Sequence, residues 1–259
     1  MKLSLKFLYV VLAWLLSSGD VLSGELPDTI DSIRNSVVAV GTVKPARGLH
    51  KKGPPVIFKG TGFIVGNGRQ VITNHHVIPE TKDLEDKESL AIFTGRGKNA
   101  KVHKARLVRS DPDHDLALLE ISGAPLPVMQ LSNGSSVREG RDVAVTGFPI
   151  GMVLGLYPVT HRGIVAAITP IVIPAISSRS LTAAQIKRMR NRYEVYQLDI
   201  VAYPGNSGSP LYNVETGEVI GVVNSVFVKG TKESALEKPS GISYAIPVKY
   251  VHDILKKNK

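Results

Sequence analysis

The sequence predicts a mostly β protein built from many short strands. Its 259 residues are 43% hydrophobic and 21% charged, a composition typical of one large or two small globular domains. The apolar stretches are short, β-branched residues are frequent, and 24 Gly and 16 Pro recur between the stretches. Short apolar runs separated by turn residues indicate strands rather than long helices.

Residues 1–23 have the three-part pattern of a secretory signal peptide. Two lysines flank the start of an apolar run at residues 7–16, and small residues follow up to Ser23. The run is too short for an ordinary membrane-spanning helix. We therefore expect export to the periplasm or the cell exterior with cleavage near Ser23. Retention of the segment as an N-terminal anchor is the alternative.

The remaining chain, residues 24–259, predicts a succession of strands. The clearest signal lies within residues 56–78, where Gly66-Asn67-Gly68 joins two apolar runs as in a β-hairpin. Residues 31–43 predict a short entry helix or turn followed by a strand, and further strand-like runs occupy residues 90–95, 100–110, 115–122, 143–150, 163–173, 195–203, 218–228 and 241–248.

Two helices are expected among these strands. Thr182 and Gln185 match a capping box at the start of a short basic helix, which lies in an insertion at residues 176–194. This insertion is either a solvated helix face or an element that gates the site. A second helix is expected at the C-terminus, in residues 247–259.

The stretch YPGNSGSPLY at residues 203–212 predicts a shaped turn that presents Ser207. Gly205 and Gly208 allow positive φ and close approach of other atoms. A serine hydroxyl is a useful nucleophile only when a base removes its proton and a third group orients that base. Ser207 is therefore a candidate nucleophile that requires a histidine and an acid elsewhere in the chain.

The order of the candidate partners distinguishes two folds. An α/β-hydrolase needs G-x-S-x-G followed by the acid and the histidine, whereas residues 205–209 read GNSGS and only His252 follows. The order histidine, aspartate, serine is that of chymotrypsin, which consists of two packed β-barrels. His76 follows a strand in ITNHHV, and Asp115 opens a strand in DLALLEI. Both precede Ser207, so this order favours the two-barrel fold.

Seven segments, in order, resemble the protease domain of HtrA/Deg-type serine proteases. They are GTGFIV (60–65), TNHHV (73–77), DLALLEI (115–121), GIVAAI (163–168), PGNSGSPL (204–211), VIGVVNS (219–225) and GISYAIP (241–247). The resemblance spans about residues 30–255. It implies a chymotrypsin-like double β-barrel, with barrels at about 30–140 and 141–247. Because the sequence ends at Lys259, we expect no PDZ domain after the protease domain.

The resemblance also assigns roles at the site. It selects His76 over its neighbour His75, and Asp115 over Asp111 and Asp113. Ser207 would attack the peptide carbonyl, His76 would transfer the proton and Asp115 would orient the imidazole. Backbone amides of Gly205 and Ser207 would form the oxyanion hole, with Asn206 shaping the turn between them.

The substrate pocket is less clearly indicated. Val201, six residues before Ser207, occupies the pocket base if trypsin-like spacing holds, and Asn224, Ser225 and Val226 would line the wall. A valine supplies no carboxylate for Lys or Arg, so we expect a preference for small or medium aliphatic side chains.

Ser209 departs from the family pattern G-N-S-G-G-P. The related glutamyl endopeptidases also carry G-S-P at this point, so a glutamate preference is an alternative. Their pocket histidine, in the strand after the serine, has no counterpart in GVVNSVFV at residues 221–228.

Metal sites and cofactors are not expected. The stretch DPDHDLALLEIS places aspartates as in a calcium loop, but Leu116 and Ser122 stand where an EF-hand needs Gly and Glu. No H-E-x-x-H occurs, which disfavours a zinc protease. The chain contains no cysteine, which excludes thiol chemistry and leaves a domain of this size stable without disulfides.

The resemblance therefore implies an exported serine endopeptidase of protein quality control, which cuts unfolded or extended polypeptides through an acyl-enzyme. The alternative is a catalytically latent binding or chaperone protein on the same fold. The family often forms trimers, so a homotrimer is expected from the resemblance alone. The net charge of +10 favours weak contact with anionic surfaces, or merely aids solubility. No specific nucleic-acid ligand is expected.

Overall fold

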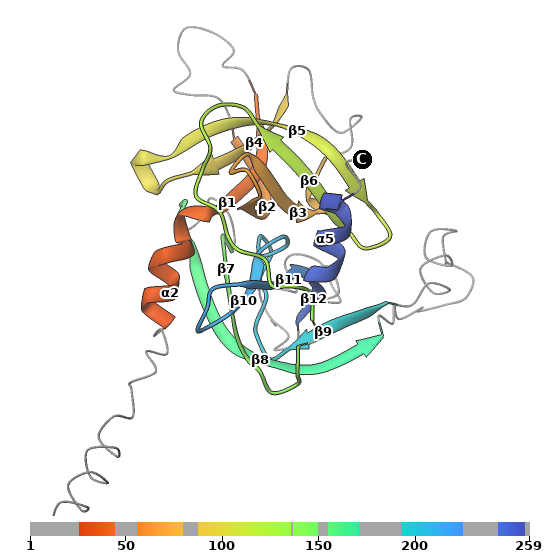
Figure 1. Cartoon of the computed structure of the whole chain (residues 1–259). Coiled ribbons are helices and arrows are strands. Elements are labelled where there is room, and N and C mark those ends of the chain that lie inside the picture. The colour runs from red at the N-terminus through yellow and green to blue at the C-terminus, as the bar shows by residue number, and fades with distance from the viewer. Residues whose placement is uncertain are drawn as a thin grey trace, which may run out of the picture.

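The protein consists of two closed, six-stranded antiparallel β-barrels (Figure 1). The computed structural model describes residues 26–44, 56–79, 88–135, 137–149, 155–170, 193–224 and 243–256. The two barrels confirm the predicted mostly β, chymotrypsin-like double-barrel fold.

The first barrel is closed in the order β1-β2-β3-β6-β5-β4. Its strands are β1 (Val37–Val43), β2 (Val56–Val65), β3 (Gln70–Asn74), β4 (Ser89–Thr94), β5 (Lys101–Asp111) and β6 (Leu116–Ile121). The β2–β3 hairpin turns at Gly66 and Gly68, which have φ of 60° and 78°, as the Asn-Gly signal predicted. Side chains alternate between two faces, so Val38 and Ile64 fill the barrel interior while Phe63 faces the other barrel.

The second barrel is closed in the order β10-β11-β12-β9-β8-β7. Its strands are β7 (Asp142–Gly147), β8 (Val159–Pro170), β9 (Glu194–Leu198), β10 (Pro210–Asn213), β11 (Val219–Asn224) and β12 (Ser243–Pro247). Apolar side chains such as Val145, Leu198 and Val223 fill its interior.

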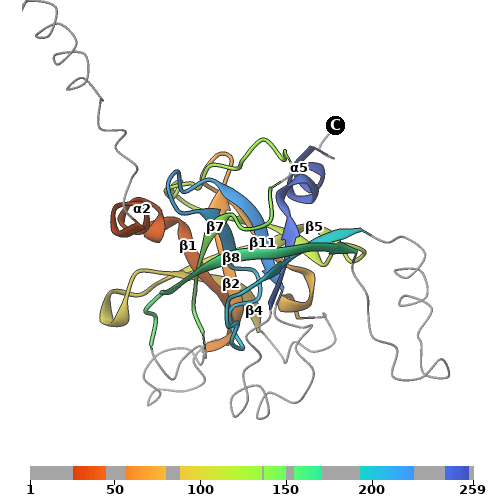
Figure 2. The same cartoon turned by 90° about the horizontal axis from the view of Figure 1, so that it is seen from below.

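A third apolar cluster joins the barrels to each other and to two helices. Phe63 of the first barrel and Tyr212 of the second are fully buried in this cluster. The helices α2 (Leu26–Ile33) and α5 (Val248–Lys256) lie on opposite sides of the molecule (Figure 2). Helix α5 buries Val251 and Ile254 in the cluster, in agreement with the predicted C-terminal helix.

Several predictions concern residues outside the described ranges. These are the signal peptide at residues 1–23, the capped helix beginning at Thr182, most of the insertion at 176–194, and the pocket residues Ser225 and Val226. Within the described ranges, no helix is both long and apolar enough to cross a membrane.

Candidate active site

His76 and Asp115 are positioned by the pairing of β3 with β6. Strand β3 ends at Asn74, and a single helical turn, His75–Val77, follows it. Asn74 pairs with Leu116, the first residue of β6, so the turn before β6 lies beside the histidines. In that turn, Asp115 has a φ of 51° and is the one non-glycine residue of the described ranges with a positive φ. Such a conformation is tolerated by Asp and Asn better than by most residues.

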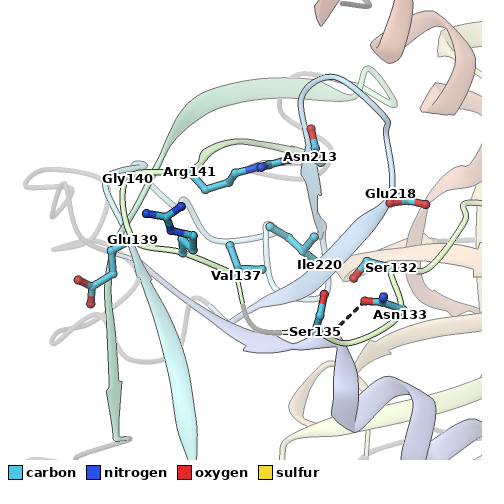
Figure 3. Close-up of a pocket in the computed structure, with 11 residues that line it drawn as sticks. Ser132, Asn133, Ser135, Val137, Glu139, Gly140, Arg141, Asn213, Glu218 and Ile220 are labelled. Carbon is cyan, nitrogen blue, oxygen red and sulfur yellow. Dashed lines mark hydrogen bonds between the residues drawn. The ribbon is translucent and has the colours of Figure 1, made fainter.

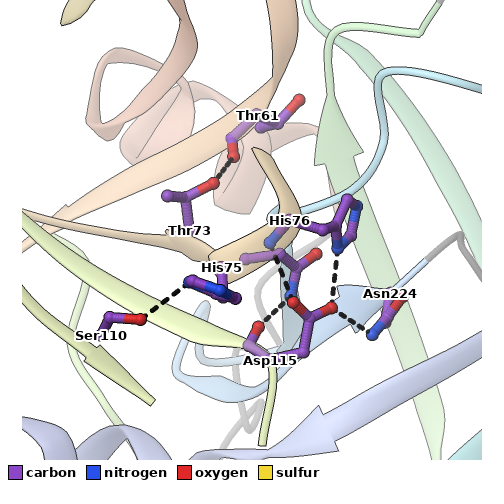
Figure 4. A network of polar contacts seen from close by, with 8 residues as sticks. Thr61, Thr73, His75, His76, Ser110, Asp115 and Asn224 are labelled. Carbon is purple, nitrogen blue, oxygen red and sulfur yellow. Dashed lines mark hydrogen bonds and ion pairs between the residues drawn. The ribbon is translucent and has the colours of Figure 1, made fainter. Parts of the chain in front are cut away.

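The Asp115 carboxylate holds His76 by two contacts (Figure 4). Its Oδ2 lies 2.7 Å from His76 Nδ1, and its Oδ1 accepts a hydrogen bond of 3.0 Å from the His76 backbone amide. Because a carboxylate only accepts, the ring donates from Nδ1. In the neutral ring, Nε2 is then left without a proton and can act as a base. The His76 side chain is 32% exposed, which leaves it accessible to a substrate.

Asn224 links this pair to the second barrel. Its Nδ2 donates a hydrogen bond of 2.7 Å to Asp115 Oδ2, the same oxygen that contacts His76. A hydrogen bond to a charged group contributes about 1.5–3 kcal/mol. The structure shows Asn224 at the end of β11, 2% exposed and bound to the carboxylate. Its place in the wall of the substrate pocket stays a prediction. Nothing local in the sequence indicates this contact, since the two residues lie in different barrels.

The neighbouring candidates make other contacts. His75 Nδ1 lies 2.7 Å from Ser110 Oγ, and its ring points away from the Asp115 carboxylate (Figure 4). Asp111 is paired with His114 at 2.9 Å. The histidine and the acid that the resemblance selected, His76 and Asp115, are therefore the pair that contact each other.

Ser207 lies in a turn fixed by its own backbone. The Asn206 amide donates to the Tyr203 carbonyl at 2.9 Å, and the Ser209 amide donates to the Asn206 carbonyl at 3.0 Å. Gly205 and Gly208 have φ of 101° and 86°, in the left-handed region where glycine avoids strain. The two glycines thus allow the backbone conformation of the turn that the sequence predicted around Ser207.

Thr61 of β2 fastens this turn to the first barrel. Its backbone amide donates to the Ser207 carbonyl at 2.8 Å, and its Oγ1 donates to the Gly205 carbonyl at 2.7 Å. Thr73 of β3 in turn donates its hydroxyl to the Thr61 carbonyl at 2.7 Å (Figure 4). No local sequence pattern indicates a role for Thr61, although it lies in the segment GTGFIV, which resembles the HtrA/Deg-type proteases.

Gly60 shows how closely the two turns approach. A Cβ built on Gly60 would lie 2.7 Å from Val77 Cγ2 and 2.8 Å from the Ser207 carbonyl oxygen, closer than real side chains come. Val77 directly follows His76, so the histidine turn and the serine turn both close on this glycine. The structure thus brings the turn that contains His76 close to the turn that contains Ser207.

Ser209 is accommodated by Gly147 of β7. Ser209 is fully buried, and a Cβ at Gly147 would lie only 2.0 Å from its Oγ. The hydroxyl therefore occupies space that any side chain at position 147 would need. Asn206, also predicted to shape the turn, is 1% exposed and lies on the same side, with Oδ1 3.0 Å from the same Cβ position.

A cavity of about 590 Å³ lies elsewhere, beside strands β10 and β11 of the second barrel (Figure 3). None of the predicted site residues lines it. Its lining residues are Ser132, Asn133, Ser135, Val137, Arg138, Glu139, Gly140, Arg141, Asn213, Glu218 and Ile220.

The family comparison agrees with the fold and the motifs. Residues 60–222 match the trypsin-like peptidase domain family, which is more than half of the chain. A probable periplasmic serine endoprotease DegP-like from Pseudomonas fluorescens is 32% identical over 195 residues, covering 75% of this chain and 34% of the relative. A protein of the same name from Hahella chejuensis is 28% identical over 291 residues, covering all of this chain and 55% of the relative. The chain thus spans between a third and about half of the length of these relatives.

Solved structures show the same architecture. The serine endoprotease from Yersinia pestis superimposes with a TM-score of 0.58 at 25% identity, covering 90% of this chain and 66% of that one. The HtrA-type protease AlgW with tripeptide gives 0.61 at 22% identity, covering 90% of this chain and 63% of that one. Together with the double barrel, the family match shows that the chain belongs to the trypsin-like peptidase family, and within that family it is similar to DegP-like and HtrA-type serine proteases.

Proposed function

We propose that this protein is an exported serine endopeptidase that hydrolyses peptide bonds of unfolded or extended polypeptides. The observation that carries the proposal is the contact of 2.7 Å between His76 Nδ1 and Asp115 Oδ2, with Asp115 Oδ1 on the His76 amide. This is the arrangement that orients a catalytic imidazole in a protein of this family.

The proposed mechanism follows from the direction of these hydrogen bonds. Asp115 accepts a hydrogen bond from His76 Nδ1–H, so His76 Nε2 is the base that takes the Ser207 hydroxyl proton as Oγ attacks the substrate carbonyl. The Gly205 and Ser207 amides would stabilise the oxyanion, and removing one such donor typically lowers kcat by about 10²–10³. His76 then protonates the leaving amine, and water hydrolyses the acyl-enzyme by the same route.

Export and location are proposed on two grounds. Residues 1–23 carry the pattern of a cleavable signal peptide. The two DegP-like relatives compared above are named as periplasmic proteins, which supports the periplasm as the destination.

Digestion of unfolded casein by purified residues 24–259 tests the proposed function. We expect the parent protein to produce fragments that mass spectrometry can map, and the Ser207→Ala variant to produce none. The matched control is Ser110→Ala, which removes a hydroxyl that contacts His75 and is expected to leave cleavage unchanged. Equal inactivity of the parent and the Ser207→Ala variant would contradict the proposal.

A further inference from the structure

His161 of β8 points into the interior of the second barrel. It pairs across the β7–β8 ladder with Val145, and directly opposed residues in a sheet present their side chains on the same face. Val145 is 1% exposed and belongs to the apolar cluster that fills this barrel. The imidazole therefore points toward the apolar side chains of this cluster, which are aliphatic except for Tyr196.

The imidazole carries a polar atom without a partner. Its Nε2 is buried and makes no hydrogen bond to any residue in the described ranges. Burial lowers the pKa of His161 from its ordinary value, so the ring is neutral at neutral pH. A buried polar group without a partner is costly, and native structures contain few of them without a functional reason.

The ring of His161 lies beside the segment that leads to Ser207. Its centroid is 6.0 Å from that of Tyr203, whose carbonyl accepts the Asn206 amide and so begins the serine turn. Residues 199–203 run along β8, because the Asp199 amide donates to the Ile164 carbonyl at 3.2 Å and a Cβ at Gly163 would lie 2.6 Å from Ile200 Cγ1. Val201, the predicted pocket base, lies in this segment between the two contacts.

We propose that His161 is a specificity-determining residue whose Nε2–H donates a hydrogen bond to the side chain of the acyl residue, the substrate residue that contributes the carbonyl of the cleaved bond. The favoured side chains end in a carboxamide or carboxylate oxygen, as in Gln and Glu. This inference rests on the proposed peptidase function. It differs from the aliphatic preference that Val201 alone predicts, because Val201 offers no polar atom. The histidine comes from β8, not from the strand after the serine.

Four peptide substrates that differ only at the acyl residue test this inference. We expect the parent protein to cleave the Gln and Glu peptides with a kcat/KM at least about tenfold above that of the Met and Leu peptides. A tenfold ratio is the effect expected from one hydrogen bond that satisfies a buried group. His161→Leu is expected to abolish this ratio by lowering kcat/KM for the Gln and Glu peptides. Cleavage without this preference, or a preference that survives in His161→Leu, would overturn the inference.

His103→Leu is the matched control for the substitution. His103 is also partly buried, but its Nε2 already contacts Thr94 Oγ1 at 2.9 Å in the first barrel. Burial and the nearby Lys101 also lower the pKa of His103. We expect the His103→Leu variant to keep the parental ratio, which separates the effect of position 161 from that of losing any half-buried histidine.

Product binding separates this inference from the proposed catalysis. In the Ser207→Ala background, calorimetry is expected to show tighter binding of a peptide ending in Gln than of one ending in Met, with the difference lost in His161→Leu. If His161→Leu does not fold, NMR of the imidazole nitrogens in Ser207→Ala provides the same test: His161 Nε2 is expected to shift on adding the Gln peptide only. A His161-dependent preference without turnover would contradict the peptidase and retain the subsite. Turnover without a His161-dependent preference would retain the peptidase and contradict the subsite. The absence of both turnover and preference would contradict both proposals.

Discussion

Replacing Asp115 with Asn is expected to lower kcat/KM for an unfolded substrate by about 10⁴, the loss seen when a serine protease acquires the wrong imidazole tautomer. Asp115 Oδ1 accepts from the His76 backbone amide, which can only donate. The carboxamide oxygen must therefore stay at that position, and its NH₂ group must take the place of Oδ2. There it faces His76 Nδ1, so Nδ1 must accept and Nε2 must carry the proton. An Nε2 that already holds a proton cannot accept one from Ser207.

The backbone at position 115 tolerates Asp115→Asn, but the new NH₂ group replaces the oxygen that accepts from Asn224 Nδ2, so the Asn224 carboxamide must turn its own oxygen toward that group. Asn tolerates the positive φ of 51° at this position as readily as Asp, so the turn has no reason to rearrange. Asp113→Asn, the same chemical change two residues earlier in the same turn, is the matched control and is expected to keep parental activity. Initial rates on casein and thermal unfolding of each variant check the prediction. An Asp115→Asn protein that is folded and within tenfold of parental activity would contradict the assigned tautomer.

Gly208→Ala is expected to lower kcat/KM by about 10² or more, because it displaces the turn that we propose forms the oxyanion site. The added Cβ would lie 2.1 Å from the Thr61 carbonyl oxygen and 2.4 Å from Thr73 Oγ1. Both atoms belong to the hydrogen bond that fastens β2 to β3, so neither can move away without breaking it. The positive φ of 86° adds strain of about 1–2 kcal/mol.

The Gly140→Ala variant separates the effect of backbone strain at a positive φ from the effect of the steric clash at Gly208. Gly140 has a φ of 81°, close to that of Gly208, but a Cβ there would meet nothing within 4 Å. We expect Gly140→Ala to reduce the free energy of unfolding by about 1–2 kcal/mol and to leave kcat/KM unchanged. Denaturant unfolding and peptide kinetics on both variants make the comparison. Similar activities for the two variants would show that the close contact at Gly208 does not control the serine turn.

The strands and hairpins could be predicted because their signals are local, whereas the double barrel and the choice of His76 and Asp115 came from the order of the candidate residues and from the resemblance to HtrA/Deg-type proteases. Hairpin residues and apolar runs lie within a few positions of the structure that they indicate. The inserted helix, the signal peptide, Ser225 and Val226 lie outside the described residues and stay predictions.

The long-range contacts could not be predicted from local patterns. Asn224 reaches Asp115 from the other barrel, and Thr61 reaches Gly205 in the same way. The departure at Ser209 is compensated by Gly147, which is remote in sequence but adjacent across the β7–β10 contact. His161 carries no motif at all. Its inward direction depends on the register with Val145 and on closure of the barrel.

The most direct test of the proposed triad is covalent labelling with a fluorophosphonate, which reacts with serine hydroxyls activated by a neighbouring base. Purified residues 24–259 and a His76→Ala variant would be treated in parallel, and the adduct mapped by mass spectrometry. The proposed mechanism predicts one adduct, on Ser207, that is lost in His76→Ala. No adduct, an adduct on another serine, or undiminished labelling of Ser207 without His76 would contradict it.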